Sequence, residues 1–326
     1  MLITGTNAKL ANWICAALSI LILSVRLVAT RIRDKKFHAA SALVAASLLV
    51  LSVRIVVVYL YLLYGTSNDV LHGEATYFDK SDLSTIKAGS ILSLISRLLI
   101  TTFYWLQISL LLLFYSSIIR DFHWINTINA CWLLIVLTYI AVALSTFLEC
   151  RPFRLYWQID PNPGQCVRAY VQLFMQGISN IVLDLFLLAI AFPMLGMRNR
   201  TWAQAARVSA LFVLGFFTII VTCLRIAYIH AENSYQPVRS FWASVQMLTS
   251  TFVANAPTIY GCYQIARRRK SEQHARRSSR PEIWLQLNES VSRTSENAPP
   301  TPPPIALIRT NETGQDDEKA WSRHIS

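Results

Sequence analysis

Long apolar blocks alternate with short polar stretches along most of the chain. Each block is roughly 20 or more residues long, which is enough for a helix to cross the roughly 30 Å hydrocarbon core of a membrane. The pattern predicts an all-α membrane protein, a bundle of seven transmembrane helices. The predicted helices cover about residues 10–30, 39–64, 88–119, 125–148, 170–195, 206–229 and 241–265.

The predicted helical domain, residues 10–268, lies between two polar segments. For residues 1–9 we predict a short extracellular N-terminus. We interpret the first apolar block as a transmembrane helix rather than a cleaved signal peptide. Residues 269–326 are rich in Ser, Pro, Arg and Glu. Because such a segment cannot bury enough apolar surface to fold alone, we expect a disordered cytosolic tail.

Charged residues are distributed unequally between the connecting loops. Basic residues follow the first, fifth and seventh predicted helices, at 31–36, 198–207 and 267–270, whereas the loop at 68–87 is acidic. Loops rich in Lys and Arg stay on the cytosolic side of a membrane. We therefore expect the N-terminus outside and the C-terminus in the cytosol. Three arginines in and beside the loop at 150–166 oppose this orientation weakly.

Composition narrows the classes of partner. The 326 residues are 54% hydrophobic and 15% charged, with a formal net charge of +12. The basic residues lie beside apolar blocks and no nucleic-acid-binding motif is present, so we expect no nucleic-acid partner. No metal-binding or nucleotide-binding motif is present, and the seventh predicted helix lacks the lysine that a retinal Schiff base needs. We therefore expect no metal and no cofactor.

Two of the six cysteines, Cys150 and Cys166, flank a polar loop between the fourth and fifth predicted helices. The loop lies on the expected outer side, where disulfides form and persist. A turn sequence at 161–164 can bring the chain back on itself. A disulfide here would stabilise the fold by about 3 kcal/mol; the alternative is two free thiols. The other four cysteines lie in apolar blocks and are interpreted as small buried hydrophobic residues.

Charged residues also interrupt the apolar blocks: Arg54, Arg97 and Arg225 in the second, third and sixth, and Asp184 in the fifth. Such charges are costly in a membrane and indicate function by default. One acid cannot neutralise three arginines, so three alternatives stay open for the surplus: pairing with carbonyl groups, lining a wet cavity or holding an anionic ligand. The alternative is a structural clamp between Asp184 and one arginine. Arg26, near the cytosolic end of the first block, is expected to reach the membrane interface.

Asn255 and Pro257 lie near the end of the seventh predicted helix. A proline inside a helix removes a hydrogen bond and kinks the helix, and an asparagine can hydrogen-bond to a neighbouring helix. This combination suits a helix that moves during signalling. It also occurs in static bundles, so both interpretations stay open.

The second half of the chain contains a series of short motifs: Glu149-Cys150-Arg151-Pro152, Trp157, Gly164-Gln165-Cys166, Asn180 to Asp184, Pro193-Met194, Leu214-Gly215, Arg225 and Pro257. With these motifs, about residues 10–268 resemble the fungal rhodopsin-like integral membrane proteins. That family includes pathogenicity-receptor-like proteins and members encoded beside secondary-metabolite genes, as in the satratoxin cluster. Two family motifs are replaced here, by His38-Ala39-Ala40 and Gln107-Ile108-Ser109.

The resemblance implies a receptor-like, multi-pass protein of the plasma membrane or an endomembrane, associated with a secondary-metabolite pathway or with environmental or host sensing. Expected partners are membrane lipid, a lipophilic small-molecule ligand, and a G-protein α subunit or another cytosolic protein that contacts the basic inner loops and tail. No catalytic motif is present. One alternative is a membrane-embedded enzyme or accessory factor, such as a cyclase, acting on a lipophilic intermediate with Glu149, Asp160 and Asp184 as its acids. A transporter is the third alternative.

Overall fold

The computed structural model describes residues 5–33, 39–68, 80–118, 125–158, 165–195 and 202–261, together with residues 263, 264, 267 and 271. Within these residues the chain forms seven long helices and no β-strand. The chain divides into two compact units, 1–267 and 268–326, and all seven helices belong to the first unit. Apart from residue 271, the expected disordered tail lies outside the described residues.

Three helices have the predicted bounds, 39–64, 125–148 and 170–195, and the other four begin before the apolar blocks from which the sequence predicts them. The first begins five residues before the predicted residue 10, and the third begins eight residues before the predicted residue 88. Polar residues extend these helices because backbone hydrogen bonding continues beyond the part that is apolar enough for lipid. The long helices are α1 (Gly5–Arg33), α2 (Ala39–Tyr64), α4 (Lys80–Ile118), α5 (Ile125–Leu148), α6 (Tyr170–Leu195), α7 (Trp202–Ala231) and a helix at 236–261.

By length and composition, six of these helices can cross a membrane. Their exposed faces are apolar. On α5, for example, the exposed Leu133, Leu137, Ile140, Leu144 and Phe147 recur every three or four residues and so form one stripe. An apolar stripe on an outward face is stable against lipid and costly against water. The chain is therefore a membrane protein.

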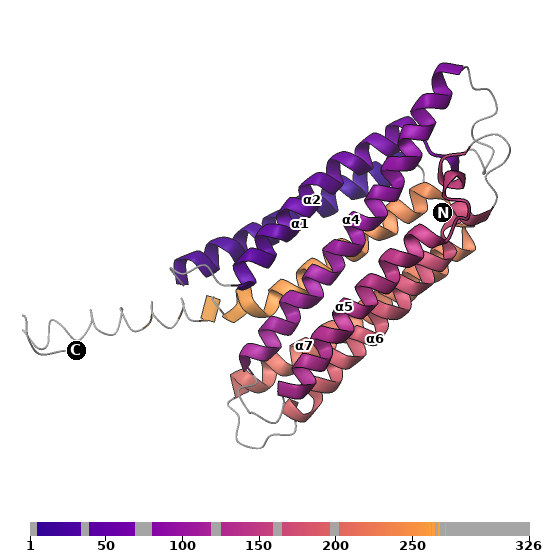
Figure 1. The fold of residues 1–326 in the computed structure, drawn as a ribbon. Helices are drawn as coiled ribbons and strands as arrows, with labels where there is room; N and C mark the ends of the chain where they lie inside the picture. The colour runs from indigo at the N-terminus through magenta and orange to yellow at the C-terminus, as the bar shows by residue number, and fades with distance from the viewer. Residues whose placement is uncertain are drawn as a thin grey trace, which may run out of the picture. The chain divides into compact units, whose positions relative to one another are not determined.

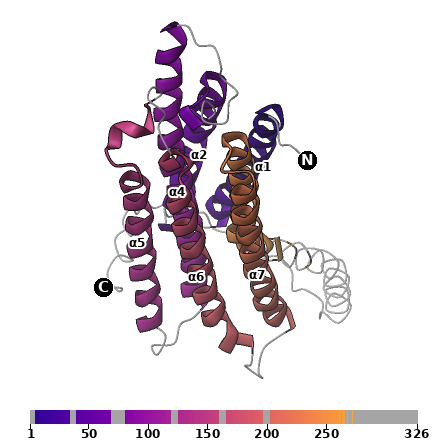
Figure 2. The same cartoon turned by 90° about the vertical axis from the view of Figure 1, so that its right-hand side faces the viewer.

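Helices that follow one another in the sequence pack against each other, from α1 with α2 through to α6 with α7. Figures 1 and 2 show these helices running alongside one another, and Figure 1 shows the helix at 236–261 in orange among them. Hydrogen bonds tie that helix to α1, α2, α4, α6 and α7. The pairs are Arg26–Asn255, Tyr61–Ser240, Tyr104–Ala243, Gln172–Arg239 and Arg225–Gln246.

The helix at 236–261 is the central helix of the bundle. Between residues 236 and 259 only Phe252 is exposed. Because the central helix contacts protein rather than lipid on most sides, it can carry polar residues. For the same reason it is not among the six helices that are apolar enough to cross a membrane by composition. It passes through Asn255 and Pro257 without interruption.

Glycine allows the close approach of α4 to the end of α2. A Cβ atom on Gly89 of α4 would lie 2.0 Å from the carbonyl oxygen of Gly65, which follows α2. Gly65 has a φ of 75°, a left-handed conformation that glycine adopts without strain. This contact fixes how closely α2 and α4 pack at this end of the bundle.

We therefore expect Gly89→Ala to destabilise the protein by about 1–3 kcal/mol, because the new methyl group meets backbone and forces the helices apart. The matched control is Gly261→Ala in the central helix, where an added Cβ meets nothing within 4 Å. Thermal unfolding of both variants in the same lipid environment measures the difference. Equal unfolding temperatures for the two variants would contradict this packing.

Candidate functional site

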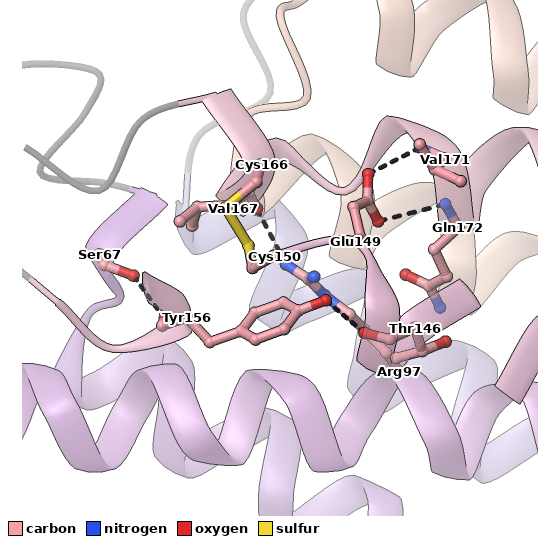
Figure 3. Close-up of a disulfide and its surroundings, with 10 residues drawn as sticks. All are labelled: Ser67, Arg97, Thr146, Glu149, Cys150, Tyr156, Cys166, Val167, Val171 and Gln172. Carbon is pink, nitrogen blue, oxygen red and sulfur yellow. Dashed lines mark hydrogen bonds between the residues drawn. A yellow bond between two sulfur atoms is a disulfide. The ribbon is translucent and has the colours of Figure 1, made fainter. Parts of the chain in front are cut away.

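A disulfide joins Cys150 and Cys166, as the sequence predicts, with 5.2 Å between their Cα atoms. Two short 3-10 helices, Phe153–Tyr156 and Gln165–Arg168, lie next to it. We call residues 149–168 the outer clip, after the outer side that the sequence predicts for this loop, and Figure 3 shows its described part. Of the other four cysteines, Cys15 and Cys131 are buried as expected and Cys223 is exposed. Cys262 lies outside the described residues.

Tyr156 anchors the outer clip to the bundle. Its hydroxyl donates to the carbonyl oxygen of Thr146 on α5, and its own carbonyl accepts from Ser67 Oγ at 3.1 Å. Burial raises the pKa of the Tyr156 hydroxyl above its usual value and outweighs the opposite effect of Arg97. The hydroxyl therefore keeps its proton and acts as a donor at neutral pH.

Glu149 caps the start of α6. Its Oε1 accepts from the backbone N–H of Val171 at 2.7 Å and its Oε2 from that of Gln172 at 3.2 Å (Figure 3). A carboxylate is stable there because the first N–H groups of a helix lack helical partners and carry partial positive charge. Both oxygens have a structural function, which weakens the alternative that Glu149 is an enzymatic acid.

Three of the charged residues singled out from the sequence lie around one cavity. Arg54 of α2, Arg97 of α4 and Arg225 of α7 line it together with Arg239 of the central helix. We call this space of about 40 Å³ the arginine cavity. No acidic side chain of the described residues lines it. The remaining lining residues are Tyr61, Ser93, Ser96, Ile100, Gln172, Gln176, Gln236, Ser240 and Ala243.

The outer clip holds two of the four arginines. Arg97 Nη2 donates to the carbonyl oxygen of Val167 at 3.2 Å, and Arg239 Nη1 donates to that of Arg168 at 2.7 Å. Both acceptors belong to the second 3-10 helix of the clip, beside Cys166 (Figure 3 shows the Arg97 contact). The disulfide therefore acts on the cavity indirectly, because it fixes the carbonyl groups that orient these two arginines.

Side chains inside the bundle hold the other two arginines. Arg54 Nη1 donates to Asn12 Oδ1 at 3.1 Å. Arg225 Nη1 donates to Gln246 Oε1 at 2.6 Å, and its Nη2 donates to Gln176 Oε1 at 3.3 Å. The Arg225 guanidinium also lies 5.8 Å from the centre of the Tyr104 ring, within the range of a cation–π interaction. Neutral groups supply all of these contacts.

Asp184 does not belong to this cluster. Its Oδ2 accepts from Thr218 Oγ1 at 2.7 Å, and it lines a second cavity of about 40 Å³ together with Asn180, Thr222 and Gln246. Among the described residues, no arginine lines that cavity. Within the described residues the structure shows no pairing of Asp184 with an arginine, so the clamp considered from the sequence is not observed there.

A polar network lies near the other end of the central helix. Arg26 Nη1 donates to the carbonyl oxygen of Ala254 and to Asn255 Oδ1, each at 2.9 Å. Asn255 Nδ2 donates to Gln107 Oε1 at 3.2 Å and to the carbonyl oxygen of Thr251 at 2.6 Å. We call Arg26, Gln107 and Asn255 the inner lock. The expectation that Arg26 reaches the membrane interface is wrong, because its side chain is 3% exposed and bonded within the bundle.

Three residues of the arginine cavity are not predicted from the sequence: Arg239, Gln172 and Gln176. Arg239 precedes the predicted seventh helix by two residues, and hydropathy gave no reason to start that helix at residue 236. Gln172 and Gln176 are uncharged and therefore carry no strong signal in an apolar block. Their spacing of four residues on α6 places them on one face. Of the three acids of the enzyme alternative, Asp160 lies outside the described residues.

Comparison with known proteins gives two matches. A family model described as the fungal rhodopsin domain matches residues 25–265, well over half of the chain. A protein of Stachybotrys chartarum (strain CBS 109288 / IBT 7711), the satratoxin biosynthesis SC1 cluster protein 4, is 27% identical over 141 residues, which are 43% of this chain and 50% of that protein. The chain therefore matches over about half the length of that curated relative. No solved structure matches the chain.

We expect alkylation of the unreduced, denatured protein to leave Cys150 and Cys166 unmodified, and mass spectrometry after reduction to find them newly reactive. We also expect Cys150→Ser with Cys166→Ser to lower stability by about 3 kcal/mol, because the loop of the unfolded chain is no longer closed. The matched control is Cys15→Ser with Cys131→Ser, which removes two buried thiols that form no disulfide. Modification of all six cysteines before reduction would contradict the disulfide.

Proposed function

Because this chain belongs to the fungal rhodopsin domain family, we propose that it is a receptor-like membrane protein whose ligand binds in the arginine cavity. One observation carries the proposal: the central helix contributes to both the cavity and the inner lock. Arg239 and Ser240 line the cavity, and Asn255 forms the lock. Sixteen residues separate Arg239 from Asn255, which corresponds to about 24 Å along a helix.

A ligand in the arginine cavity would contact the outer half of the central helix. It shifts the equilibrium between two helix positions only if it binds one of them more tightly. The inner lock stabilises one of these two positions. Its residues, Arg26, Gln107 and Asn255, come from three helices, so their contacts break when the central helix moves to the other position. Pro257 supports this role, since it has no N–H to donate and leaves one helical carbonyl without its usual partner.

We place the outer clip on the extracytosolic side. A disulfide persists in an oxidising compartment, and the clip contacts Ser67, which follows α2 and precedes the acidic segment of the sequence. In the sequence, basic segments follow α1 and α6, and the positive-inside rule assigns such segments to the cytosol. The clip precedes α6, so it lies at the opposite end of that helix from Leu195, where the described part of α6 ends. In this orientation the inner lock lies toward the cytosolic side, where a G-protein α subunit would bind the basic loops and the C-terminal tail.

We further propose that the protein is associated with a secondary-metabolite pathway or with environmental or host sensing. Support comes from the relative, whose name refers to satratoxin biosynthesis. The enzyme alternative has less support, since Glu149 caps α6 and Asp184 lies about 18 Å further along that helix than Gln172. Two acids so far apart cannot act on one bond.

We expect Asn255→Ala to raise ligand-independent nucleotide exchange on a fungal heterotrimeric G protein by about 5-fold or more, because it breaks the inner lock and releases the central helix. The measurement uses the purified full chain in nanodiscs. Ser52→Ala is the control, since Ser52 is exposed and its hydroxyl donates to the carbonyl oxygen of Leu48 in the same helix. A control receptor should stimulate nucleotide exchange under the same conditions. If neither the wild type nor the variant does so, the proposal of G-protein coupling is wrong.

Metabolite profiling of a deletion strain separates the three functions. For a receptor-like protein we expect all metabolites of a pathway to fall together, because regulation changes while chemistry is intact. Re-expression of the wild-type chain should restore them. Accumulation of one unreacted precursor would instead support the enzyme, and redistribution of product between cells and medium would support the transporter.

A further inference from the structure

We propose that the arginine cavity binds a carboxylate group. This inference rests on the proposed function, because it names the chemistry of the ligand in that cavity. It draws on three properties of the cavity: its charge, its unused hydrogen-bond donors and its size.

The charge of the cavity is positive and is not balanced by its described lining. Arginine side chains remain positively charged in proteins. The four arginines are held by carbonyl oxygens, side-chain amides, a thioether and an aromatic ring, none of which carries a negative charge. Buried charges in proteins are paired or hydrogen-bonded to charged groups. An anion in the cavity would supply the balancing charge.

Several donors on the lining residues have no partner within the described protein. They are Arg54 Nε, Arg97 Nε and Nη1, Arg225 Nε and Gln176 Nε2. The four residues are between 1% and 9% exposed, so bulk water does not surround them. Buried polar groups in folded proteins nearly always have a partner. A ligand for this site must therefore be rich in acceptors, as an ionised carboxylate is.

The size of the cavity selects among anions. A cavity needs about 10–15 Å³ of space, measured for the centre of a water-sized sphere, to hold one water-sized group. By the same measure, the arginine cavity of about 40 Å³ holds about three such groups. A carboxylate has three heavy atoms, whereas sulfate and phosphate have five. Carboxylate geometry also matches the two parallel donors of a guanidinium.

The substituent of the carboxylate has space on the side of the outer clip. A smaller cavity of about 10 Å³ shares Ser93 and Arg97 with the arginine cavity and is also lined by Tyr156 and Val167 of the clip. Its size fits a short substituent. A free organic acid and a fatty acid carry the same carboxylate group, and the experiment below tests both.

The test measures thermal unfolding of the purified full chain in nanodiscs against increasing acetate, decanoate or sulfate at constant ionic strength. A ligand that binds only the folded state raises the unfolding temperature in a saturable way. We expect saturation with acetate if a free acid is the ligand, or with decanoate alone if it is a fatty acid. General salt stabilisation does not saturate and is common to all variants.

Two substitutions make the test specific to the cavity. Arg225→Gln should weaken carboxylate binding about tenfold or more, because it removes a charge-assisted contact. Gln176→Glu places a carboxylate beside Arg225, so it should raise the unfolding temperature without ligand and abolish the response to added carboxylate. Because this variant is expected to gain stability, misfolding cannot mimic the result.

Gln264→Glu is the matched control. It makes the same change of charge at a residue that bonds Tyr260 and belongs neither to the cavity lining nor to the inner lock. This control should keep the carboxylate response. Three results would overturn the proposal: no saturable response in wild type, sulfate binding as tightly as carboxylate, or an unchanged response in Gln176→Glu.

The measurement contains no G protein, so the two proposals can fail separately. Loss of carboxylate binding would leave the effect of Asn255→Ala on nucleotide exchange standing. If the protein does not stimulate nucleotide exchange, the proposal that the arginine cavity binds a carboxylate still stands.

Discussion

Four guanidinium groups must keep their charge and find hydrogen bonds inside a membrane-spanning bundle, and much of the structure serves this constraint. Removing a charge from water is costly unless other polar groups replace the water. Here the replacements come from every side of the arginine cavity: backbone carbonyls of the outer clip, amides of α1, α6 and the central helix, and the ring of Tyr104. The cavity therefore depends on elements that are far apart in the sequence.

The central helix follows from the same constraint. A helix surrounded by lipid must be apolar, whereas a helix surrounded by other helices can carry polar residues if they find partners. The central helix shares hydrogen bonds with five other helices, and its buried polar residues occur from Gln236 to Asn255. Such a helix connects the two ends of the bundle, because any shift along its axis alters partners at both.

The outer clip contains several of the motifs that carry the family resemblance, and it also supports the arginine cavity. The disulfide between Cys150 and Cys166 closes the connection between α5 and α6, and Glu149 caps α6 in the same segment. The carbonyl groups of Val167 and Arg168 then point at Arg97 and Arg239. The motif Glu-Cys-Arg-Pro and its second cysteine thus have a structural role that extends into the cavity.

The sequence by itself determined the membrane-spanning helices and the disulfide. Hydropathy reports the environment of a segment, and two cysteines that flank one short loop have few other partners. It also identified Arg54, Arg97, Arg225 and Asp184 as unusual, because a charge in an apolar block is visible without a fold. Only the tertiary structure decided which of them meet. It grouped the three arginines with Arg239, separated Asp184 and buried Arg26, since these outcomes depend on which helix faces pack together and on contacts between residues as distant as Arg26 and Asn255.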